Sequence, residues 1–408
     1  MDYKVLDKNS VIEYLLEIKE IKNFFESEEI EAKEIGDGNL NFVYLVSLID
    51  NPEKSMIVKQ AVPYLRCVGE EFPLSRERMT YEIRALDKFY SIFPNFVPRV
   101  YYSSEEMSLV AMEYLSNHII MREGLINRVK YENFSEHIST YMAATLFYTS
   151  SLSLSSVDKR DLMAKFNQNV ELCKLTEDLV FSFAFMEHET NDNANVESNE
   201  NAQKLFADRK FKAKVLGLKY TFMTQSDALL HGDLHTGSIM INSDETYVID
   251  PEFAFVGPFG FDVGALLANL VNNYIHHSIV TKDEEFQKWL LHVIKDTLEK
   301  FSEKFLEFWA ESKETALLVD GYLDSETLDT YKNNFVKNIL KDSVGFAGCK
   351  IARRIYGVAG VEEIRGINDI TLRREAEAMA LRIAREFVMN YERIENTDEI
   401  LEIIKSAR

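Results

Sequence analysis

The stretch HGDLHTGS at 231–238, followed by the acidic turn DPE at 250–252, decides the fold of this 408-residue chain. An apolar run at 228–230 leads into the first stretch, and two short strand-like segments, 239–241 and 247–249, flank a polar turn. This order predicts a loop, a hairpin and an acidic turn. We expect the layout to present Asp233 and Asp250 at one rim.

The residue types in these stretches are those that phosphoryl transfer to a hydroxyl requires. One carboxylate orients or receives the hydroxyl proton, and others hold the Mg²⁺ that bridges nucleotide phosphates. Kinase-type enzymes take these groups from a loop Asp, an Asn five residues later and an Asp on a following turn. Asp233 and Asp250 match the two acids, but Ser238 stands in place of the Asn, so we predict that Glu252 supplies the missing oxygen. A polar hairpin with incidental acids is the alternative, but loop, hairpin and turn agree with one another.

Composition indicates an ordinary soluble globular protein, with 46% hydrophobic and 28% charged residues, and the length suggests two lobes or domains. No apolar run reaches the roughly 18 residues of a membrane span, and the first residues do not resemble a signal peptide. We therefore expect a cytoplasmic protein with no membrane partner. The three cysteines, at widely separated positions 67, 173 and 349, are typical of reduced thiols rather than of disulfides or a zinc site.

The formal net charge of −21 argues against a nucleic-acid partner, because nucleic acids are bound through basic surfaces. An anionic nucleotide must then be held by a few local cations. Each well-placed Lys or Arg is therefore informative.

A turn and a strand lysine indicate a nucleotide site in the first 112 residues. Gly38, Asn39 and Asn41 lie in a turn where the backbone could approach phosphates, although two glycines alone are as typical of a plain hairpin. Lys59 follows the strand-like Met56-Ile57-Val58, which is the pattern of the lysine that pairs nucleotide phosphates. The predicted elements of this lobe are helices at 11–26 and 75–89 and strands at 32–35, 42–49, 55–59, 100–103 and 108–112.

The helix at 75–89 should face Lys59 and supply its carboxylate partner. Glu82 is our candidate and Glu77 the second choice, while a solvated face remains the alternative for either. The strand that ends at 112 continues into a segment that suits a hinge between lobes, at 113–117. Backbone groups of Glu113 and Leu115 would bind adenine there.

Residues 118–408 predict a mostly helical lobe, with helices at 134–151, 263–276, 285–310, 325–356 and 372–391. Asp262 can serve as the N-cap of one of them, and a capping or loop-bracing role is favoured over catalysis. The polar stretch at 187–203 predicts an exposed loop with little core to bury.

Arg353 and Arg354 lie beside Lys350 in an apolar context, near the end of a long predicted helix. Adjacent helix residues point roughly 100° apart, but both arginines could converge on one site if the helix ends near Gly357. A solvent-facing pair that balances nearby acids is the alternative, and the residues alone leave both open.

The chain resembles the 5-methylthioribose kinases, which are relatives of the aminoglycoside phosphotransferases and choline kinases. The resemblance spans almost the whole chain. It is carried by GDGNLNFVY at 36–44, IVKQAVPY at 57–64, HGDLHTGS at 231–238, DPEFAF at 250–255, GFD at 260–262 and FAGCKIARRIYGVA at 346–359.

This resemblance implies an α+β, protein-kinase-like fold of two lobes: a small β-rich nucleotide lobe at 1–112, a hinge at 113–117 and a mostly helical catalytic and substrate-binding lobe at 118–408. It implies Mg²⁺-dependent transfer of the ATP γ-phosphate to the 1-hydroxyl of 5-methylthioribose in methionine salvage, with Asp233, Arg353 and Arg354 at the substrate, and a homodimer. Two positions depart from the family pattern: Phe72 where a tryptophan is expected, and Gly360 where a histidine is expected.

Three other functions are alternatives to this kinase activity. His231, Asp233 and His235 could bind a transition metal in a hydrolase, but only eight histidines occur and no other His-rich spacing supports such a site. A catalytically inactive nucleotide-binding module is disfavoured because Lys59, Asp233 and Asp250 are all present. A related kinase for choline, homoserine or an aminoglycoside is the third.

Overall fold

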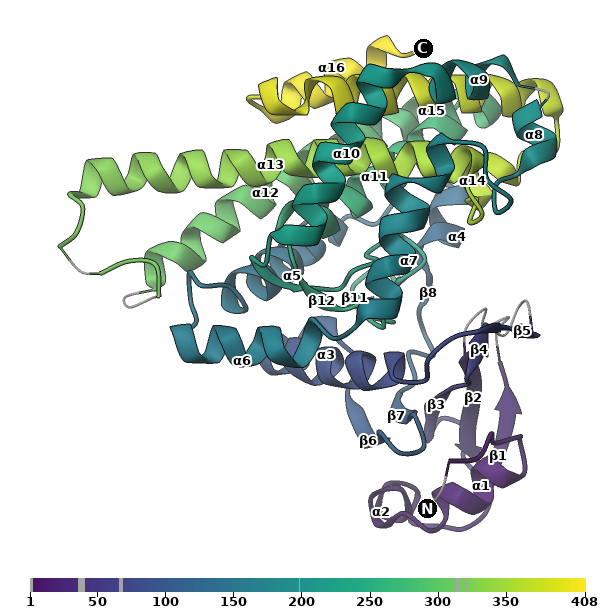
Figure 1. Ribbon diagram of the computed structural model, residues 1–408. Helices are drawn as coiled ribbons and strands as arrows, with labels where there is room; N and C mark the ends of the chain where they lie inside the picture. Colours follow the sequence, from purple (N-terminus) through teal and green to yellow (C-terminus); the bar gives the residue numbers. More distant parts are fainter. Residues whose placement is uncertain (1–2, 36–40, 66–68, 198, 313–315, 320) are drawn as a thin grey trace. The chain divides into compact units, whose positions relative to one another are not determined.

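The computed structural model describes residues 3–35, 41–65, 69–197, 199–312, 316–319 and 321–408. The chain divides into two compact units (Figure 1): unit 1 comprises Met1–His118 and Tyr247–Ala254, and unit 2 comprises Ile119–Thr246 and Phe255–Arg408. Unit 1 is built on an antiparallel sheet and unit 2 is mostly helical, which confirms the α+β, protein-kinase-like fold. The roles of 1–112, 113–117 and 118–408 as nucleotide lobe, hinge and substrate lobe stay predictions.

Unit 1 contains a five-stranded antiparallel sheet in the order β1-β2-β3-β7-β6. Lys59 lies on the central strand, opposite Val43 of β2 and Val110 of β7. The strands are β1 (Ile30–Glu34), β2 (Asn41–Leu48), β3 (Ser55–Ala61), β6 (Val100–Ser104) and β7 (Leu109–Glu113), with a separate pair β4 (Tyr64–Leu65) and β5 (Gly69–Pro73).

Alternation along β3 separates the core of unit 1 from its polar face. Met56 and Val58 are fully buried in one hydrophobic cluster with Val11 and Ile21 from two short helices, α1 (Ser10–Leu15) and α2 (Lys19–Phe25). Side chains alternate across a strand, so Lys59 points to the other face. That face is next to α3 (Arg78–Ile92), which is followed by the short helix η1 (Pro94–Phe96).

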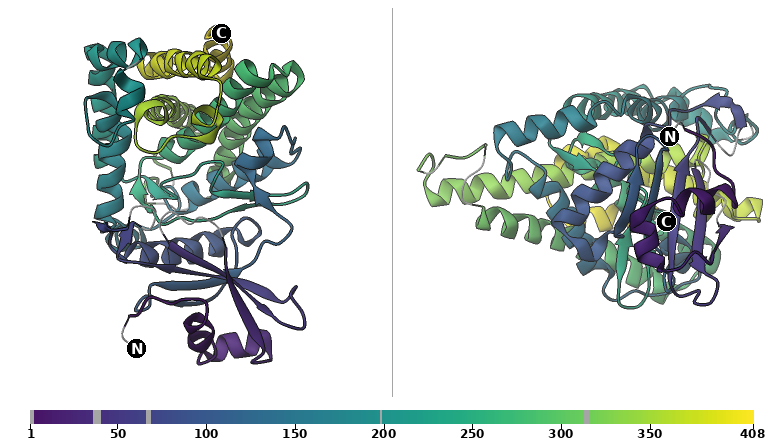
Figure 2. Two further views of the ribbon diagram at one scale, coloured as in Figure 1. Left: turned by 90° about the vertical axis from the view of Figure 1, so that its right-hand side faces the viewer. Right: turned by 90° about the horizontal axis from the view of Figure 1, so that it is seen from below.

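The single helix predicted over 11–26 is wrong, because the chain leaves helical geometry between α1 and α2 (Figure 2). Ile18 has an extended backbone, with φ −94° and ψ 122°, yet it remains in the hydrophobic cluster. Apolar spacing therefore continues through the break, which is why the pattern suggested one helix.

Many helices of unit 2 begin with a side chain that accepts a backbone N–H at the N-terminus, as at Asp283, Asp324 and Asp369. The helices of unit 2 are α4 (Met121–Ile126), α5 (Phe134–Tyr148), α6 (Ser156–Phe166), α7 (Val170–Phe181), η2 (Phe183–Phe185), α8 (Asn193–Glu197), α9 (Glu200–Ala207), α10 (Arg209–Thr224), α11 (Gly260–His276), η3 (His277–Thr281), α12 (Glu284–Glu311), α13 (Ser325–Tyr356), α14 (Glu362–Arg365), α15 (Ile370–Asn390), η4 (Tyr391–Arg393) and α16 (Thr397–Ser406). The short strands are β8 (Ile119–Ile120), β9 (Ala228–Leu230), β10 (Ile239–Ile241) and β12 (Phe255–Gly257), and β11 (Thr246–Val248) carries the chain into unit 1.

Two buried helices, α11 and α13, form the centre of unit 2, and aromatic rings fill the space beside them. The ring of Phe261 lies 4.8 Å from that of Phe222 and 5.4 Å from that of Phe346, between centroids. The backbones also approach closely, since a Cβ added to Gly264 would lie 2.4 Å from the carbonyl oxygen of Ser343. This contact fixes the start of α11 against α13.

The exposed loop predicted at 187–203 is wrong, because this stretch contains α8 and the first half of α9. Two of its asparagines are buried: the side-chain amides of Asn195 and Asn199 donate to Glu377 of α15 at 3.0 and 2.9 Å. Hydrogen bonds to a buried carboxylate thus add to the apolar contacts of the buried Val196, Ala202 and Leu205.

Among the described residues, no helix combines the length and the apolar character that a membrane span requires.

We predict that Gly264→Ala lowers the free energy of unfolding by about 1 to 3 kcal/mol, because the new methyl group must push α11 away from Ser343. The matched control is Gly217→Ala on the exposed face of α10, where no atom lies within 4 Å of the added Cβ. That change should instead raise the free energy by roughly 0.5 to 1 kcal/mol, because alanine is the better helix former. Urea unfolding followed by circular dichroism measures both, and wild-type stability of Gly264→Ala would contradict the close packing.

Candidate functional site

Lys59 is the centre of a buried ion-pair cluster in unit 1. Its Nζ donates to Oε1 of Glu82 on α3 at 2.9 Å and also pairs with the carboxylate of Asp250. Glu82 is fully buried, whereas Glu77 is exposed, so the carboxylate that contacts Lys59 is that of Glu82. Burial alone would lower the pKa of Lys59, but the carboxylates of Asp250 and Glu82 hold it above its usual value.

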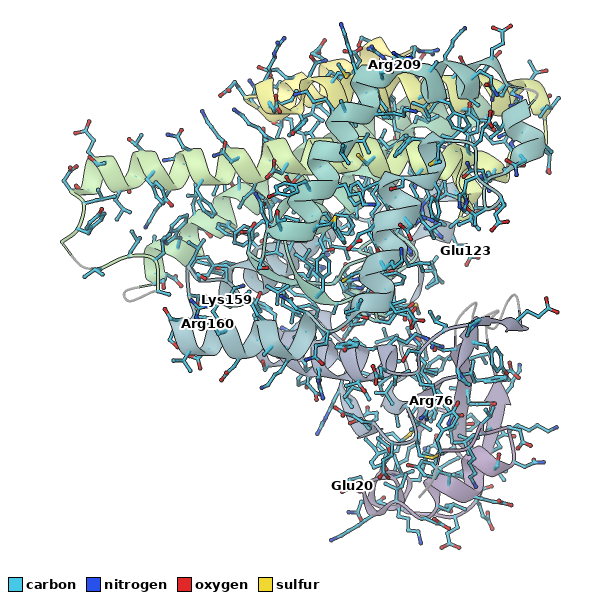
Figure 3. The ribbon with its side chains drawn as sticks, in the orientation of Figure 1. Glu20, Arg76, Glu123, Lys159, Arg160 and Arg209 are labelled. Atoms are coloured by element: carbon cyan, nitrogen blue, oxygen red, sulfur yellow. The ribbon has the colours of Figure 1, made fainter. Side chains whose placement is uncertain are left out.

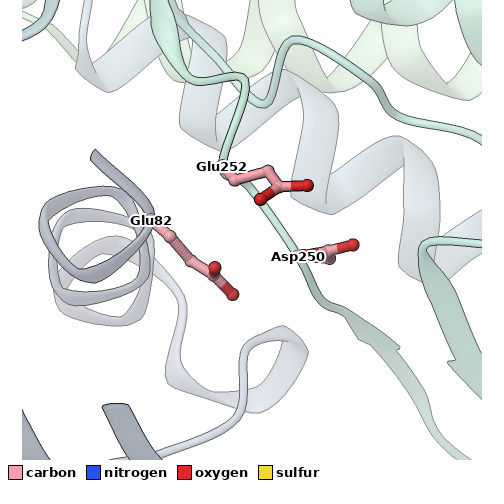
Figure 4. A group of neighbouring side chains, drawn as sticks. All are labelled: Glu82, Asp250 and Glu252. Carbon is pink, nitrogen blue, oxygen red and sulfur yellow. The ribbon is translucent and has the colours of Figure 1, made fainter. Parts of the chain in front are cut away.

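Three carboxylates of unit 1 lie close enough to share a cation (Figure 4). One oxygen from each of Glu82, Asp250 and Glu252 lies within 4.8 Å of the others. Burial and the charge of Asp250 raise the pKa of Glu82 and of Glu252, although Lys59 and Arg78 act in the opposite direction. Hard carboxylate oxygens are the ligands that Mg²⁺ takes, so the donor set fits the predicted metal. Glu82 was predicted only as the lysine partner, and its place in this group was missed.

Asp250 has a left-handed backbone, with φ 67°, which is unfavourable for a residue other than Gly. Such strain persists only where the surrounding structure imposes it, and it is common at functional sites. The acidic turn is therefore held in a specific geometry by its neighbours.

Glu252 and Asn41 are bound to each other and to Arg78. The Asn41 amide donates to Oε2 of Glu252 at 3.1 Å, its carbonyl accepts from Arg78 at 3.0 Å, and Arg78 Nε lies 3.6 Å from Glu252. Asn41 was predicted as a nucleotide ligand, and the structure places it beside a predicted metal ligand. Both roles stay predictions.

Four further residues are predicted to bind ATP: Gly38, Asn39, Glu113 and Leu115. Gly38 and Asn39 lie outside the described residues. The backbone N–H of Glu113 donates to the carbonyl of Arg99 at 2.9 Å, and the carbonyl of Leu115 accepts from His118 at 3.1 Å. Neither bond uses the Glu113 carbonyl or the Leu115 N–H, so adenine binding by these two residues stays a prediction.

In unit 2, the loop at 231–238 is held by Asp262. Its carboxylate accepts hydrogen bonds from the backbone N–H groups of His231 at 2.6 Å and Gly232 at 3.0 Å. Asp262 lies inside the first turn of α11, so its prediction as the N-cap is wrong and the loop-bracing role is the observed one. Helix α11 starts earlier than predicted because Phe261 is packed into the aromatic core.

Asp233 is held from both sides of its carboxylate. Oδ1 accepts from Nζ of Lys350 at 3.0 Å, and Oδ2 lies 3.3 Å from Nε2 of His235. Burial would raise the pKa of Asp233, but the cation of Lys350 keeps this pKa well below the usual range. Asp233 is therefore ionised at neutral pH.

His235 contacts Asp233 as a neutral donor. Burial lowers the pKa of His235 to about 4, and its Nδ1 accepts from the backbone N–H of Gly237 at 3.0 Å. The ring proton must then sit on Nε2, the atom that faces Asp233. Ser238, a predicted metal ligand, donates from Oγ to the Asp233 carbonyl and contacts His235, both at 3.2 Å. Its metal role stays a prediction.

Lys350, Arg353 and Arg354 form a buried group of cations on α13. They are 3, 6 and 7% exposed, so the solvent-facing alternative for the arginines is wrong. Burial lowers the pKa of both arginines, to about 9 for Arg354, and the charge of Asp233 acts on both. As predicted, α13 ends at Tyr356, where the N–H of Gly357 donates to the carbonyl of Arg353.

The position of Gly360, where a histidine was expected, is explained by Arg365. A Cβ at Gly360 would lie 2.0 Å from Cδ of Arg365, whose guanidinium donates to the carbonyls of Ile355 at 3.1 Å and Gly357 at 2.6 Å. Arg365 thus fills the space of the missing side chain and caps the end of α13. The side chain of Phe72, the other departure, lies outside the described part of the chain.

Lys350 is the main residue that the sequence did not identify as part of the site. The signal was present: positions 350, 353 and 354 have the i, i+3, i+4 spacing that places side chains on one face of a helix. Arg122 and Glu363, which pair at 3.4 Å near this group, gave no such signal because they come from different helices.

Known proteins match this chain over most of its length. The phosphotransferase enzyme family matches residues 31–284. Methylthioribose kinase 1 of Oryza sativa subsp. japonica is 40% identical, with 92% of this chain and 89% of the relative covered. A methylthioribose kinase of Geobacillus sp. is 41% identical, with coverage of 92% and 90%. That of Escherichia coli O45:K1 is 38% identical, with coverage of 93% and 91%.

Matches of this identity and coverage show the family. The chain belongs to the phosphotransferase enzyme family and, within it, to the methylthioribose kinases.

Proposed function

We propose that this enzyme transfers the γ-phosphate of ATP to the 1-hydroxyl of 5-methylthioribose and releases ADP and 5-methylthioribose 1-phosphate, a step of methionine salvage. The observation that carries the proposal is the ionised carboxylate of Asp233, fixed between Lys350 and His235. The family supplies the identity of the sugar. Choline, homoserine and aminoglycosides are the acceptors of the alternative activities.

Asp233 is the catalytic residue in this proposal. Because its carboxylate is ionised and fixed, it can accept a hydrogen bond from the 1-hydroxyl and receive the proton as the bond to phosphorus forms. The bond between the γ-phosphorus and the oxygen bridging it to the β-phosphate breaks, and ADP leaves with the electron pair. The low pKa of Asp233 suits orientation of the hydroxyl with late proton transfer.

Unit 1 would bind the nucleotide. Lys59, fixed by Glu82, would contact its phosphates, while Asp250 and Glu252 would hold Mg²⁺. The metal would supply charge neutralisation on the phosphate oxygens. Arg353 and Arg354 in unit 2 would contact the sugar and the transferred phosphoryl group, since a guanidinium offers two parallel donors to such groups.

The experiment that tests the activity is a coupled assay of ADP release with 5-methylthioribose, choline, homoserine and an aminoglycoside as acceptors. We expect turnover with 5-methylthioribose, and preference for another acceptor would overturn the substrate assignment. The homodimer and the cytoplasmic location stay predictions.

Asp233→Asn should reduce kcat by roughly 10²- to 10⁴-fold, because the amide cannot accept the hydroxyl proton. ATP affinity, measured by calorimetry, should stay close to wild type, since this carboxylate acts on the sugar. Asp244→Asn, on the exposed turn after β10, is the matched control and should behave as wild type. Retention of half the wild-type kcat by Asp233→Asn would rule out the assignment.

Asp250→Ala and Glu252→Ala should each raise the Mg²⁺ concentration needed for half-maximal rate, because each removes a charged oxygen ligand. Ser238→Ala should have a smaller effect, since a neutral hydroxyl is a weaker ligand for Mg²⁺ than a carboxylate. Titrations of rate against Mg²⁺ measure the order, with the exposed Glu77→Ala as control in unit 1. Greater sensitivity of Ser238→Ala than of Glu252→Ala would show that Glu252 does not replace the usual Asn.

Arg353→Lys and Arg354→Lys should each lose substantial kcat/KM for 5-methylthioribose, because an ammonium cannot reproduce the forked donors. ATP binding without sugar should change little. The control is Arg382→Lys on α15, where the guanidinium donates two hydrogen bonds to the Ala407 carbonyl. It removes a guanidinium of this kind outside the site. Wild-type kinetics in both site variants would argue against substrate contact.

A further inference from the structure

We propose that Lys350 is a positioning residue for the reaction: its ammonium group fixes the carboxylate of Asp233 and supplies the positive charge that this carboxylate needs in a buried site. The inference rests on the proposed function, in which Asp233 acts on the acceptor hydroxyl. It assigns a role in the reaction to a residue of α13 that lies 117 positions after Asp233 in the sequence.

The geometry of Lys350 is that of a dedicated ion pair. Its Nζ lies 3.0 Å from Oδ1 of Asp233 and 4.6 Å from the centroid of the Phe261 ring, and the residue is only 3% exposed. Phe261 is fully buried in the aromatic core. An ammonium packed on an aromatic face in this way has one carboxylate contact and little freedom to find another.

The other polar groups around Asp233 do not replace this contact. His235 is neutral and serves as a hydrogen-bond donor. Arg354 donates to the Ala359 carbonyl at 3.0 Å, and its charge, like that of Arg353, reaches Asp233 without a described hydrogen bond to its carboxylate. Within the described chain, the cation that touches the carboxylate is that of Lys350.

Charged groups on the loop, on α13 and on α11 act on the charge of Lys350. Burial lowers the pKa of Lys350 to about 8, Asp233 of the loop acts to raise it, and Arg353 and Arg354 of the same helix act to lower it. The carboxylate of Asp262 on α11 also interacts electrostatically with the ammonium group of Lys350. The group is protonated below this pKa and neutral above it, so the ion pair is present at pH 7 and is lost as the pH rises.

The kinetic test compares Lys350→Met and Lys350→Arg. Lys350→Met should lower kcat roughly 10- to 100-fold, the effect of a lost hydrogen bond to a charged group, with little change in KM for ATP. Wild-type kcat should fall on the alkaline side with a midpoint at about pH 8. In Lys350→Arg, which keeps its charge, kcat should recover at least in part and this midpoint should move upward.

The matched control is Lys159→Met. Lys159, labelled in Figure 3, is also buried in unit 2 and also has a pKa lowered by burial to about 8, but it donates to the carbonyls of Thr149 and Asp227. Its replacement should leave the alkaline midpoint of kcat unchanged. If the midpoint is unchanged in Lys350→Arg, it reports another group, such as Arg354, and the proposal is overturned.

A second measurement does not depend on activity. In protein labelled with [ε-¹³C]lysine, the Lys350 resonance, assigned by its absence from Lys350→Arg, should titrate near pH 8 in the wild type. In Asp233→Asn its pKa should fall by about 1 to 3 pH units, because the opposite charge is gone. An unchanged pKa would overturn the ion pair. Absence of turnover with 5-methylthioribose would overturn the proposed function alone, since this titration does not depend on it.

Discussion

The carboxylate of Asp262 accepts the backbone N–H groups of His231 and Gly232, and the geometry of the loop that carries Asp233 depends on this interaction. Gly232 has φ 83°, a conformation that glycine adopts without strain. Asp262 is itself fixed because Phe261, the residue before it, is anchored among the rings of the core. Packing in the centre of unit 2 is thus transmitted to the loop through two hydrogen bonds.

Burial of charge is the second constraint, and each unit meets it in its own way. In unit 1, Lys59 is shared by Glu82 and Asp250, while Arg78 lies beside Glu252. In unit 2 the proportions are reversed, since the charges of Lys350, Arg353 and Arg354 all act on the carboxylate of Asp233. A site with more carboxylates than basic groups is suited to binding a cation. A site with more basic groups than carboxylates is suited to binding an anionic phosphoryl group. The two excesses agree with the division of roles between nucleotide and acceptor that we propose.

Local patterns predicted much of this architecture. The strands of unit 1, the lysine on β3 and the ends of α13 follow from alternation and apolar spacing, because each signal lies within a few residues. The predictions fail where contacts between residues far apart in the sequence determine the local structure. Asn195 of α8 and Asn199, the N-cap of α9, are both held by the distant carboxylate of Glu377, and Ile18 interrupts a helix while staying in the core. The contact of Lys350 with Asp233 likewise joins positions that no local pattern connects. A common rim for Asp233 and Asp250 stays a prediction, since the two residues belong to different units.

The end of α13 has a consequence for the cations that it carries. The aligned peptide dipoles of a helix place a partial negative charge at its C-terminus, and α13 ends at Tyr356, two residues after Arg354. This partial charge attracts the arginines before any ligand arrives, and Arg365 adds a further guanidinium, which donates to the carbonyls of Ile355 and Gly357. Mutual repulsion within the cationic group is reduced by the backbone itself. The end of the helix thus offsets part of the charge of the arginines without a bound anion.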